Sequence, residues 1–133
     1  MARPRVKVYF DGGARPNPGR MEAAVVLRGA VHLFDNLGEG TNTQAEWLAL
    51  IHALRVAQAA GLSDFDLIGD SATVIDQAND KIKCRSAELA VYLGQFTDLS
   101  VKGGPTRICR IPRAQNLAGI ALETRRRELR QGH

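Results

Sequence analysis

The stretch Val6-Lys7-Val8-Tyr9-Phe10-Asp11-Gly12-Gly13 decides the fold of this 133-residue chain. Its apolar residues alternate with Lys7 and Tyr9, and this period of two is typical of a β-strand. We expect Asp11 to be the last residue of the strand, because two glycines follow it directly. The turn-forming residues that continue as far as Gly19 then predict a loop.

The residues after this loop predict four further strands and four helices from the spacing of their apolar side chains. The strands are expected at Ala23–Leu27, Val31–Leu37, Phe65–Ile68 and Thr106–Ile111. The helices are expected at Thr41–Ala60, Ala72–Asn79, Ser86–Leu99 and Ala114–Arg130. This order predicts an α/β fold in a single domain over residues 1–133: a mixed five-stranded sheet, with a three-strand antiparallel meander plus parallel strands, flanked by helices.

Composition and charge predict a cytoplasmic protein with an apolar core and no membrane span. Hydrophobic residues make up 44% of the chain, but no uninterrupted apolar stretch is long enough to cross a bilayer. The basic start, Met1–Lys7, leads into a strand and is not expected to be a signal peptide. Cys84 and Cys109 are interpreted as two reduced thiols. Residues 102–133 hold eight Lys or Arg against two Asp or Glu, which suits either contact with phosphates or a solvated helix face.

Three acidic residues lie where predicted strands or helices meet loops, namely Asp11, Glu46 and Asp70. Each has a structural alternative. Asp11 before glycine would start a turn, Thr43 and Glu46 have the spacing of a capping box, and Asp70 would cap the following helix.

Taken together, the three acids predict a metal site. Glu46 shares the helix face of Leu50 and Ala57, so its carboxylate is expected to be buried and to need compensating positive charge. If the first and fourth strands are neighbours, Asp11 and Asp70 meet at one edge of the sheet. Converging carboxylates repel one another, and Mg²⁺ or Mn²⁺ relieves that repulsion because these hard ions prefer oxygen ligands.

Five sequence motifs, spread over residues 8 to 123, resemble those of type 1 ribonuclease H in order and spacing. They are Val8–Gly13 with Asn17–Gly19, Thr41–Glu46 with Ala49 and Leu50, Gly69–Ser71 with Val74, Ile75 and Gln77, Ile82–Arg85, and Ile111–Arg113 with Asn116. The short connector at Ile82–Arg85 is similar to that of the compact bacterial and archaeal branch, which lacks the extra basic handle helix. The resemblance implies a ribonuclease H-like fold.

The resemblance also implies roles for individual residues. Asp11, Glu46 and Asp70 match the family's catalytic, metal-binding acids, with Asp11 bridging two Mg²⁺ ions, or Mn²⁺ in their place. Four further positions match groups that meet the minor groove and 2′-hydroxyls of a hybrid duplex: Gly12, Gly13, Asn17 and Asn42. Lys83 and Arg85 match a connector that contacts phosphates, and a solvated turn is the alternative for them.

The chain departs from the family pattern in its last motif. The family's fourth acid stands four residues after the motif's Asn, and here that position is Ile120. Glu123 lies one turn later on the same helix face, and we hypothesise that it partly substitutes as a metal ligand. Arg113 replaces the family's mobile His and is expected to contact nucleic acid. Ala72 replaces a polar side chain that contacts the groove in many members.

The function predicted is metal-dependent endonucleolytic hydrolysis of the RNA strand of RNA–DNA hybrids, leaving 5′-phosphate and 3′-hydroxyl ends. Activity is expected to be reduced by the loss of the fourth acid at Ile120. The alternative is a weakly active or inactive nucleic-acid-binding module that retains the fold, and a third hypothesis is another phosphoryl hydrolase. The partner is expected to be hybrid nucleic acid and not a membrane, and the chain to be a monomer rather than a dimer. His32, His52 and His133 are given no catalytic role.

Overall fold

The computed structural model of the chain describes residues 5–131. Its strands are β1 (Val6–Arg15), β2 (Gly19–Leu27), β3 (Ala30–Phe34), β4 (Glu39–Gly40), β5 (Phe65–Gly69) and β6 (Arg107–Arg110). Its helices are α1 (Asn42–Ala59), α2 (Ala72–Ala78), α3 (Ala87–Ser100), the 3₁₀ helix η1 (Arg113–Gln115) and α4 (Leu117–Gln131). His133 and the beginning of the Met1–Lys7 segment, discussed above, lie outside the described residues.

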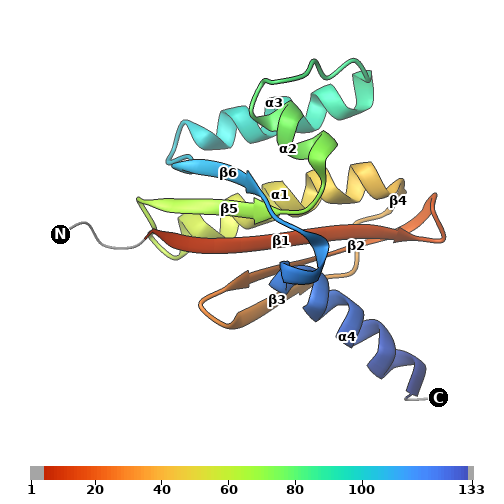
Figure 1. Cartoon of the computed structure of the whole chain (residues 1–133). Helices are drawn as coiled ribbons and strands as arrows, with labels where there is room; N and C mark the ends of the chain where they lie inside the picture. The colour runs from red at the N-terminus through yellow and green to blue at the C-terminus, as the bar shows by residue number, and fades with distance from the viewer. Residues whose placement is uncertain (1–4, 132–133) are drawn as a thin grey trace.

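The strands form one mixed sheet in the order β3-β2-β1-β5-β6, which confirms the predicted α/β architecture (Figure 1). β1, β2 and β3 pair antiparallel as a meander, and β5 pairs parallel with both β1 and β6. The predicted number of strands was one too low, because β4 adds a short pairing between Glu39–Gly40 and Gly19–Arg20 of β2. A strand of only two residues is too short to show the alternation of apolar side chains by which strands are recognised in a sequence.

The predicted end of β1 was wrong, because the strand continues through the two glycines to Arg15. Its antiparallel pairing with β2 extends from Val8↔Leu27 to Arg15↔Arg20, so the hydrogen-bonded ladder overrides the local turn preference of Gly12 and Gly13. The parallel pairing with β5 stops at Tyr9↔Ile68. Asp11 therefore lies within a strand, just beyond the point where β1 and β5 separate.

Helices cover both faces of the sheet (Figure 1). On one face α1 is backed by α3, and the main core includes Phe10, Trp47 and Leu54. On the other face α4 packs against β1 and β2 through a small cluster that includes Ala24 and Leu122. Successive side chains of a strand point to opposite faces, so the two helices sandwich β1 and β2 between them.

The connection between α2 and α3 is short, as the motif Ile82–Arg85 predicts. Residues 79–86 join the two helices without a further helix between them. Cys84 lies in this connection and Cys109 in β6, and both are free thiols. Among residues 5–131 no helix is both long enough and apolar enough to cross a membrane.

Gly12 sets the distance between β1 and α1. A Cβ atom at this position would lie 2.2 Å from the carbonyl oxygen of Ala45, which belongs to the backbone of the helix and cannot turn aside. The helix therefore lies against the bare backbone of the strand. This contact places Glu46, the next residue of α1, directly beside β1.

We expect Gly12→Ala to lower the free energy of unfolding by about 2–3 kcal/mol, because the added methyl group must push α1 away from β1. Gly94→Ala is the matched control, since a Cβ at Gly94 in α3 meets no atom within 4 Å. That control should raise stability by roughly 0.5–1 kcal/mol, because alanine is the better helix former. Urea unfolding of both variants measures the difference, and equal stability of Gly12→Ala and the parent would contradict the contact.

Candidate active site

The three acidic residues that the sequence singled out converge. Asp11 comes from β1, Glu46 from α1 and Asp70 from the residue after β5, and one carboxylate oxygen of each lies within 4.8 Å of the others. Asp11 and Glu46 are buried, each with 8% of its surface exposed, and Asp70 is half-buried. Three segments distant in the sequence thus build one acidic cluster.

The structural alternatives for these acids are wrong. α1 begins with a capping box formed by Thr41 and Gln44, so Glu46 has no capping role. The N-cap of α2 is Ser71, whose hydroxyl accepts from the backbone N–H of Val74. Asp11 lies opposite Ala24 in the ladder between β1 and β2, and so does not start a turn.

Asn116 holds Asp70 in place. Its side chain is fully buried, and its Nδ2 donates to Asp70 Oδ2 at 2.8 Å and to the carbonyl oxygen of Phe10 at 3.0 Å. Its Oδ1 accepts from the backbone N–H of Ala118 at 3.1 Å, in the first turn of α4. One amide therefore joins β1, the end of β5 and the start of α4. It lies in the last motif, but its positioning role was not predicted.

The cluster is electrostatically strained without a cation. Burial, together with the neighbouring Asp11 and Asp70 carboxylates, raises the pKa of Glu46 well above its ordinary value. The pKa of Asp11 is raised as well, mainly by burial, although its contact with the Glu46 carboxyl and the guanidinium groups of Arg113 and Arg126 act in the opposite direction. These shifts mean that the two carboxylates bind protons more readily than free carboxylates do, and that nearby positive charge would relieve their repulsion.

One oxygen of Glu46 shows how a metal ion fits. Its Oε1 accepts from the Gly12 N–H at 3.3 Å, whereas its buried Oε2 has no hydrogen-bond partner among the described residues. A buried carboxylate oxygen without a donor is costly. A hard divalent ion beside Asp11, Glu46 and Asp70 satisfies that oxygen, and the all-oxygen donor set suits Mg²⁺ or Mn²⁺.

The cluster opens into a polar pocket of about 360 Å³. Around the carboxylates, the lining includes Gly12, Gly13, Asn42, Arg113 and Arg126. Negative charge at the bottom is thus surrounded by amide and guanidinium donors. Such a pocket suits a phosphate group that approaches a metal ion, because donors meet its oxygens from the side.

Asn17 and Asn42 lie together at one side of this pocket. Asn17 Oδ1 accepts from the backbone N–H of Asn42 at 3.0 Å, and Asn42 Oδ1 accepts from the backbone N–H of Ala14 at 2.8 Å. Each amide oxygen is thus used within the protein, whereas neither side-chain NH₂ donates a hydrogen bond to another described residue. Asn42 thus links Asn17 to the pocket, and its Oδ1 would lie 3.7 Å from a Cβ at Gly13.

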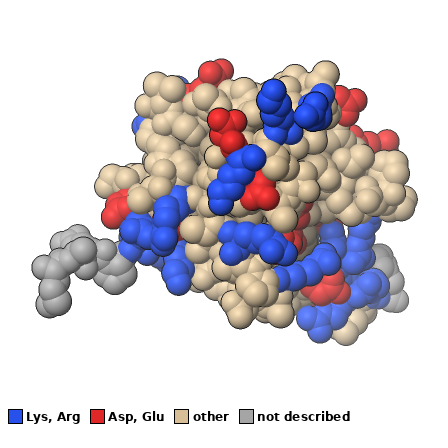
Figure 2. All heavy atoms as spheres, turned by 45° about the horizontal axis from the view of Figure 1, so that its top comes forward, with Lys and Arg blue, Asp and Glu red and all other residues tan. Residues whose placement is uncertain are grey.

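Lys83 and Arg85 lie apart from this pocket. Both are exposed in the connection between α2 and α3, and neither belongs to the lining of the carboxylate pocket. Arg113 is exposed in η1 and does line it. Figure 2 shows Lys and Arg gathered over the lower half of the face that it presents, with fewer acidic groups among them.

The vacant place of the fourth acid faces solvent. Ile120 is 48% exposed, and a Cβ at the preceding residue, Gly119, would lie 3.4 Å from Asp11 Oδ2. Glu123 lines a small hollow together with Asp11 and Ile120. One of its carboxylate oxygens lies 3.8 Å from Arg15 and the other 3.8 Å from Arg130. Within residues 5–131 it is not a member of the acidic cluster.

Arg126 is a residue of the site that the sequence analysis missed. It lines the carboxylate pocket, and its Nε forms an ion pair with Glu22 of β2. The signal for it was the helical period, because Arg126 stands seven residues after Gly119 and therefore on the same face of α4. The two neighbouring arginines concealed that signal, since a run of arginines resembles a solvated helix face.

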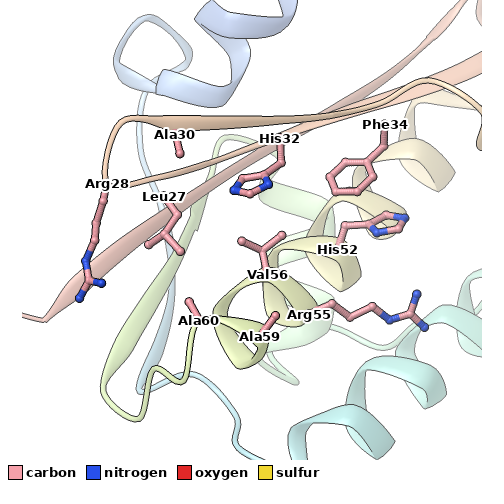
Figure 3. A pocket seen from close by; sticks show the side chains of 10 residues that line it. All are labelled: Leu27, Arg28, Ala30, His32, Phe34, His52, Arg55, Val56, Ala59 and Ala60. Atoms are coloured by element: carbon pink, nitrogen blue, oxygen red, sulfur yellow. The ribbon is translucent and has the colours of Figure 1, made fainter.

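A larger hollow lies away from the carboxylate pocket and is mostly apolar (Figure 3). It has a volume of about 620 Å³, lies between β3 and the C-terminal half of α1, and contains His32 and His52 but no acidic residue. His52 stacks on Phe34 with 4.1 Å between ring centroids, and its pKa is lowered by burial and by Arg55. The two histidines thus lie away from the acidic cluster.

Comparisons with known proteins agree with this geometry. A family model described as reverse transcriptase-like matches residues 9–122. Ribonuclease HI of Halobacterium salinarum is 33% identical over 127 residues, which cover 89% of this chain and 62% of that protein. A bifunctional protein of Mycobacterium tuberculosis is 29% identical over 118 residues, which cover 84% of this chain and 32% of that protein. The chain thus spans less than two thirds of the length of these relatives.

Solved structures give the same result. The crystal structure of RNase H1 from Halobacterium salinarum superposes with a TM-score of 0.80 and 34% identity, covering 91% of this chain and 99% of that chain. LC11-RNase H1, solved in complex with an RNA/DNA hybrid, superposes with a TM-score of 0.72 and 27% identity, covering 85% and 89%. With the family model matched over residues 9–122, these likenesses show that the chain belongs to the ribonuclease H-like family.

Proposed function

We propose that this protein is a divalent-metal-dependent endonuclease that hydrolyses the RNA strand of RNA–DNA hybrids and leaves 5′-phosphate and 3′-hydroxyl ends. The observation that carries the proposal is the convergence of Asp11, Glu46 and Asp70 to within 4.8 Å on a ribonuclease H-like fold. The relatives named ribonuclease HI, and the one solved with a hybrid, support the choice of substrate.

Asp11, Glu46 and Asp70 are proposed to hold Mg²⁺, with Mn²⁺ able to replace it. The unpartnered Oε2 of Glu46 supports this assignment, because it is a buried acceptor with no hydrogen-bond partner among the described residues. A bound ion supplies positive charge that activates water and stabilises the charge that develops on the phosphate. The family resemblance implies two ions bridged by Asp11, and only the first of them has the three acids as ligands.

The chain's other residues are proposed to bind and orient the duplex. The side-chain NH₂ groups of Asn17 and Asn42, beside the backbone of Gly12 and Gly13, suit acceptors in a shallow groove and on 2′-hydroxyls. Arg113 is placed to donate to a phosphate at the pocket rim. Lys83 and Arg85 are proposed to bind phosphates further along the duplex.

The remaining features of the proposal concern the protein as a whole. We propose a single ribonuclease H-like domain over residues 1–133 that acts as a monomer in the cytoplasm and binds no membrane. The two free thiols, Cys84 and Cys109, support a reducing compartment.

A second candidate function is a nucleic-acid-binding module with little or no turnover. The exposed side chain of Ile120 in place of the fourth acid favours it, because isoleucine offers no oxygen to a metal ion. The cluster of three acids argues for the enzyme, since binding nucleic acid does not require buried carboxylates.

We expect Asp70→Asn to reduce cleavage of a labelled RNA–DNA hybrid by at least about 100-fold under matched Mg²⁺, because a charged ligand is lost while the hydrogen bond from Asn116 can persist. Gel-resolved cleavage with Mg²⁺ and then Mn²⁺ measures the effect, with Asp11→Asn as a second inactive variant. Cleavage by Asp70→Asn at the parent's rate would contradict the proposed site. If the parent protein binds the hybrid but does not cleave it with Mg²⁺ or with Mn²⁺, the binding module is favoured.

The raised pKa values of Asp11 and Glu46 predict how stability depends on pH. Protonation of these groups stabilises the folded state fully below their ordinary pKa values, and this contribution is lost as the pH rises through the raised values. Because Mg²⁺ competes with the protons, we expect it to raise the melting temperature little at about pH 5 and by about 4 °C at about pH 8.

Glu46→Gln is the control for this pH effect. Glutamine keeps the acceptor for the Gly12 N–H but cannot repel Asp11, so the metal-free variant should be more stable than the parent at about pH 8, by about 1 kcal/mol. It should also gain little from Mg²⁺. Thermal unfolding that shows the same Mg²⁺ effect in both proteins would mean that the ion binds elsewhere.

Glu123→Gln tests whether Glu123 replaces the missing fourth acid. We expect cleavage within about three-fold of the parent, because an exposed carboxylate engaged with two guanidinium groups contributes little to a site beyond its reach. Cleavage rates over a range of Mg²⁺ concentrations provide the measurement. A marked loss of cleavage, recovered at high Mg²⁺, would instead identify Glu123 as a ligand.

A further inference from the structure

Arg126 is held beside the acidic cluster more firmly than a surface arginine. Its side chain is only 16% exposed, and its Nε is paired with Glu22, whose side chain is 17% exposed. Its Nη2 lies 3.0 Å from the position that a Cβ of Gly13 would occupy. The missing side chain of Gly13 therefore makes room for the guanidinium group, and the shielded ion pair fixes its direction.

Asp11 lies between two hollows that share Arg113 and Arg126 but differ in their acidic residues. One is the carboxylate pocket, in which Asp11 faces Glu46 and Asp70. The other has a volume of about 270 Å³ and is lined by Asp11, Gly119, Ile120, Glu123 and three arginines, Arg113, Arg126 and Arg127. Arg113 and Arg126 line both hollows, but Arg113 is exposed, whereas Arg126 is held in place by its ion pair with Glu22.

The second hollow is a poor place for a divalent ion. Asp11 shares its charge with the acidic cluster, Glu123 is engaged by Arg15 and Arg130 at 3.8 Å, and Ile120 offers no ligand atom. An ion there would meet several guanidinium groups at close range. Repulsion between like charges in a partly buried pocket is stronger than in water.

We propose that Arg126, held by Glu22, supplies the second positive charge of this site in place of a second divalent ion, and binds the phosphate group that is cut. This inference rests on the proposed function. The acidic side of Asp11 then takes one divalent ion, and the guanidinium side takes phosphate oxygens. Arg126 is a catalytic residue in this arrangement, whereas Glu22 is a positioning residue.

Arginine suits this task because of its shape and constant charge. Pairing through Nε leaves the two terminal nitrogens to donate to phosphate oxygens in a planar fork. A guanidinium group stays charged at any pH at which the protein is folded, so its contribution needs no ion from solution. The arrangement also accounts for the exposed Ile120. The fourth acid would be a ligand for the second ion, and that ion is not needed when Arg126 supplies the positive charge.

The experiment compares the parent with Arg126→Gln and with a matched control, Arg125→Gln. Arg125 is the preceding residue, pairs with Asp35, and does not line the carboxylate pocket. Mn²⁺ binding is measured by calorimetric titration without substrate. Single-turnover cleavage of an RNA–DNA hybrid is measured at saturating Mg²⁺, and thermal unfolding confirms that each variant is folded.

We expect one Mn²⁺ per parent chain. Arg126→Gln should bind Mn²⁺ about three- to ten-fold more tightly, because a like charge beside Asp11 is removed. The same variant should cleave about 100-fold more slowly, because the phosphate loses a charged donor. Arg125→Gln should change neither quantity by more than about two-fold. Tighter metal binding with slower cleavage is a signature that damage to the fold does not produce, since damage weakens both.

Two Mn²⁺ ions bound to the parent would overturn the inference, and so would weaker Mn²⁺ binding by Arg126→Gln or cleavage at the parent's rate. The proposed function fails separately, if the parent does not cut hybrid with Mg²⁺ or Mn²⁺. In that event the number of ions and the direction of the affinity change still decide the role of Arg126 as the second positive charge.

Discussion

The close approach of α1 to β1 at Gly12 is the constraint on which the rest of the site depends. Because a Cβ there would lie 2.2 Å from the Ala45 carbonyl oxygen, only glycine lets the helix lie against the strand. Glu46 then accepts from the Gly12 N–H and reaches Asp11, whose side chain lies on the opposite face of the sheet, the face covered by α4. Two buried carboxylates that meet in this way need protons or a cation. The fold thus buries negative charge that needs a positive counter-charge before any substrate is bound.

α4 covers the other face of the sheet and supplies positive charge to the site. Its first turn is fixed by Asn116, which also holds Asp70, so the position of the helix and the position of one acid are set by the same amide. Two turns later Arg126 returns to the site, directed by Glu22. Asp11 therefore lies between the other two acids, Glu46 and Asp70, and the guanidinium group of Arg126. A phosphodiester suits such a division, because its charged oxygens meet donors on one side and the ion on the other.

The strands and helices were predictable wherever apolar periodicity was long. Apart from β4 and η1, the order of elements, the meander and the parallel strands were inferred correctly, and the long helix α1 was located to within one residue at each end. The errors lie where tertiary contacts override local preference. The glycines after Asp11 favour a turn in isolation, yet the ladder to β2 carries β1 on to Arg15. β4 exists only because Gly19 and Arg20 offer it a partner.

The sequence by itself determined which three acids form the cluster, because motif order and spacing select Asp11, Glu46 and Asp70, and it revealed that Ile120 replaces an expected fourth acid. It did not determine what surrounds them. That Asn116 binds Asp70, that Glu46 has an unpartnered oxygen, and that Arg126 rather than its neighbours enters the site were decided by the tertiary structure. The reason is physical: motifs record residues along the chain, whereas charge and hydrogen bonding act through space between segments that only packing brings together.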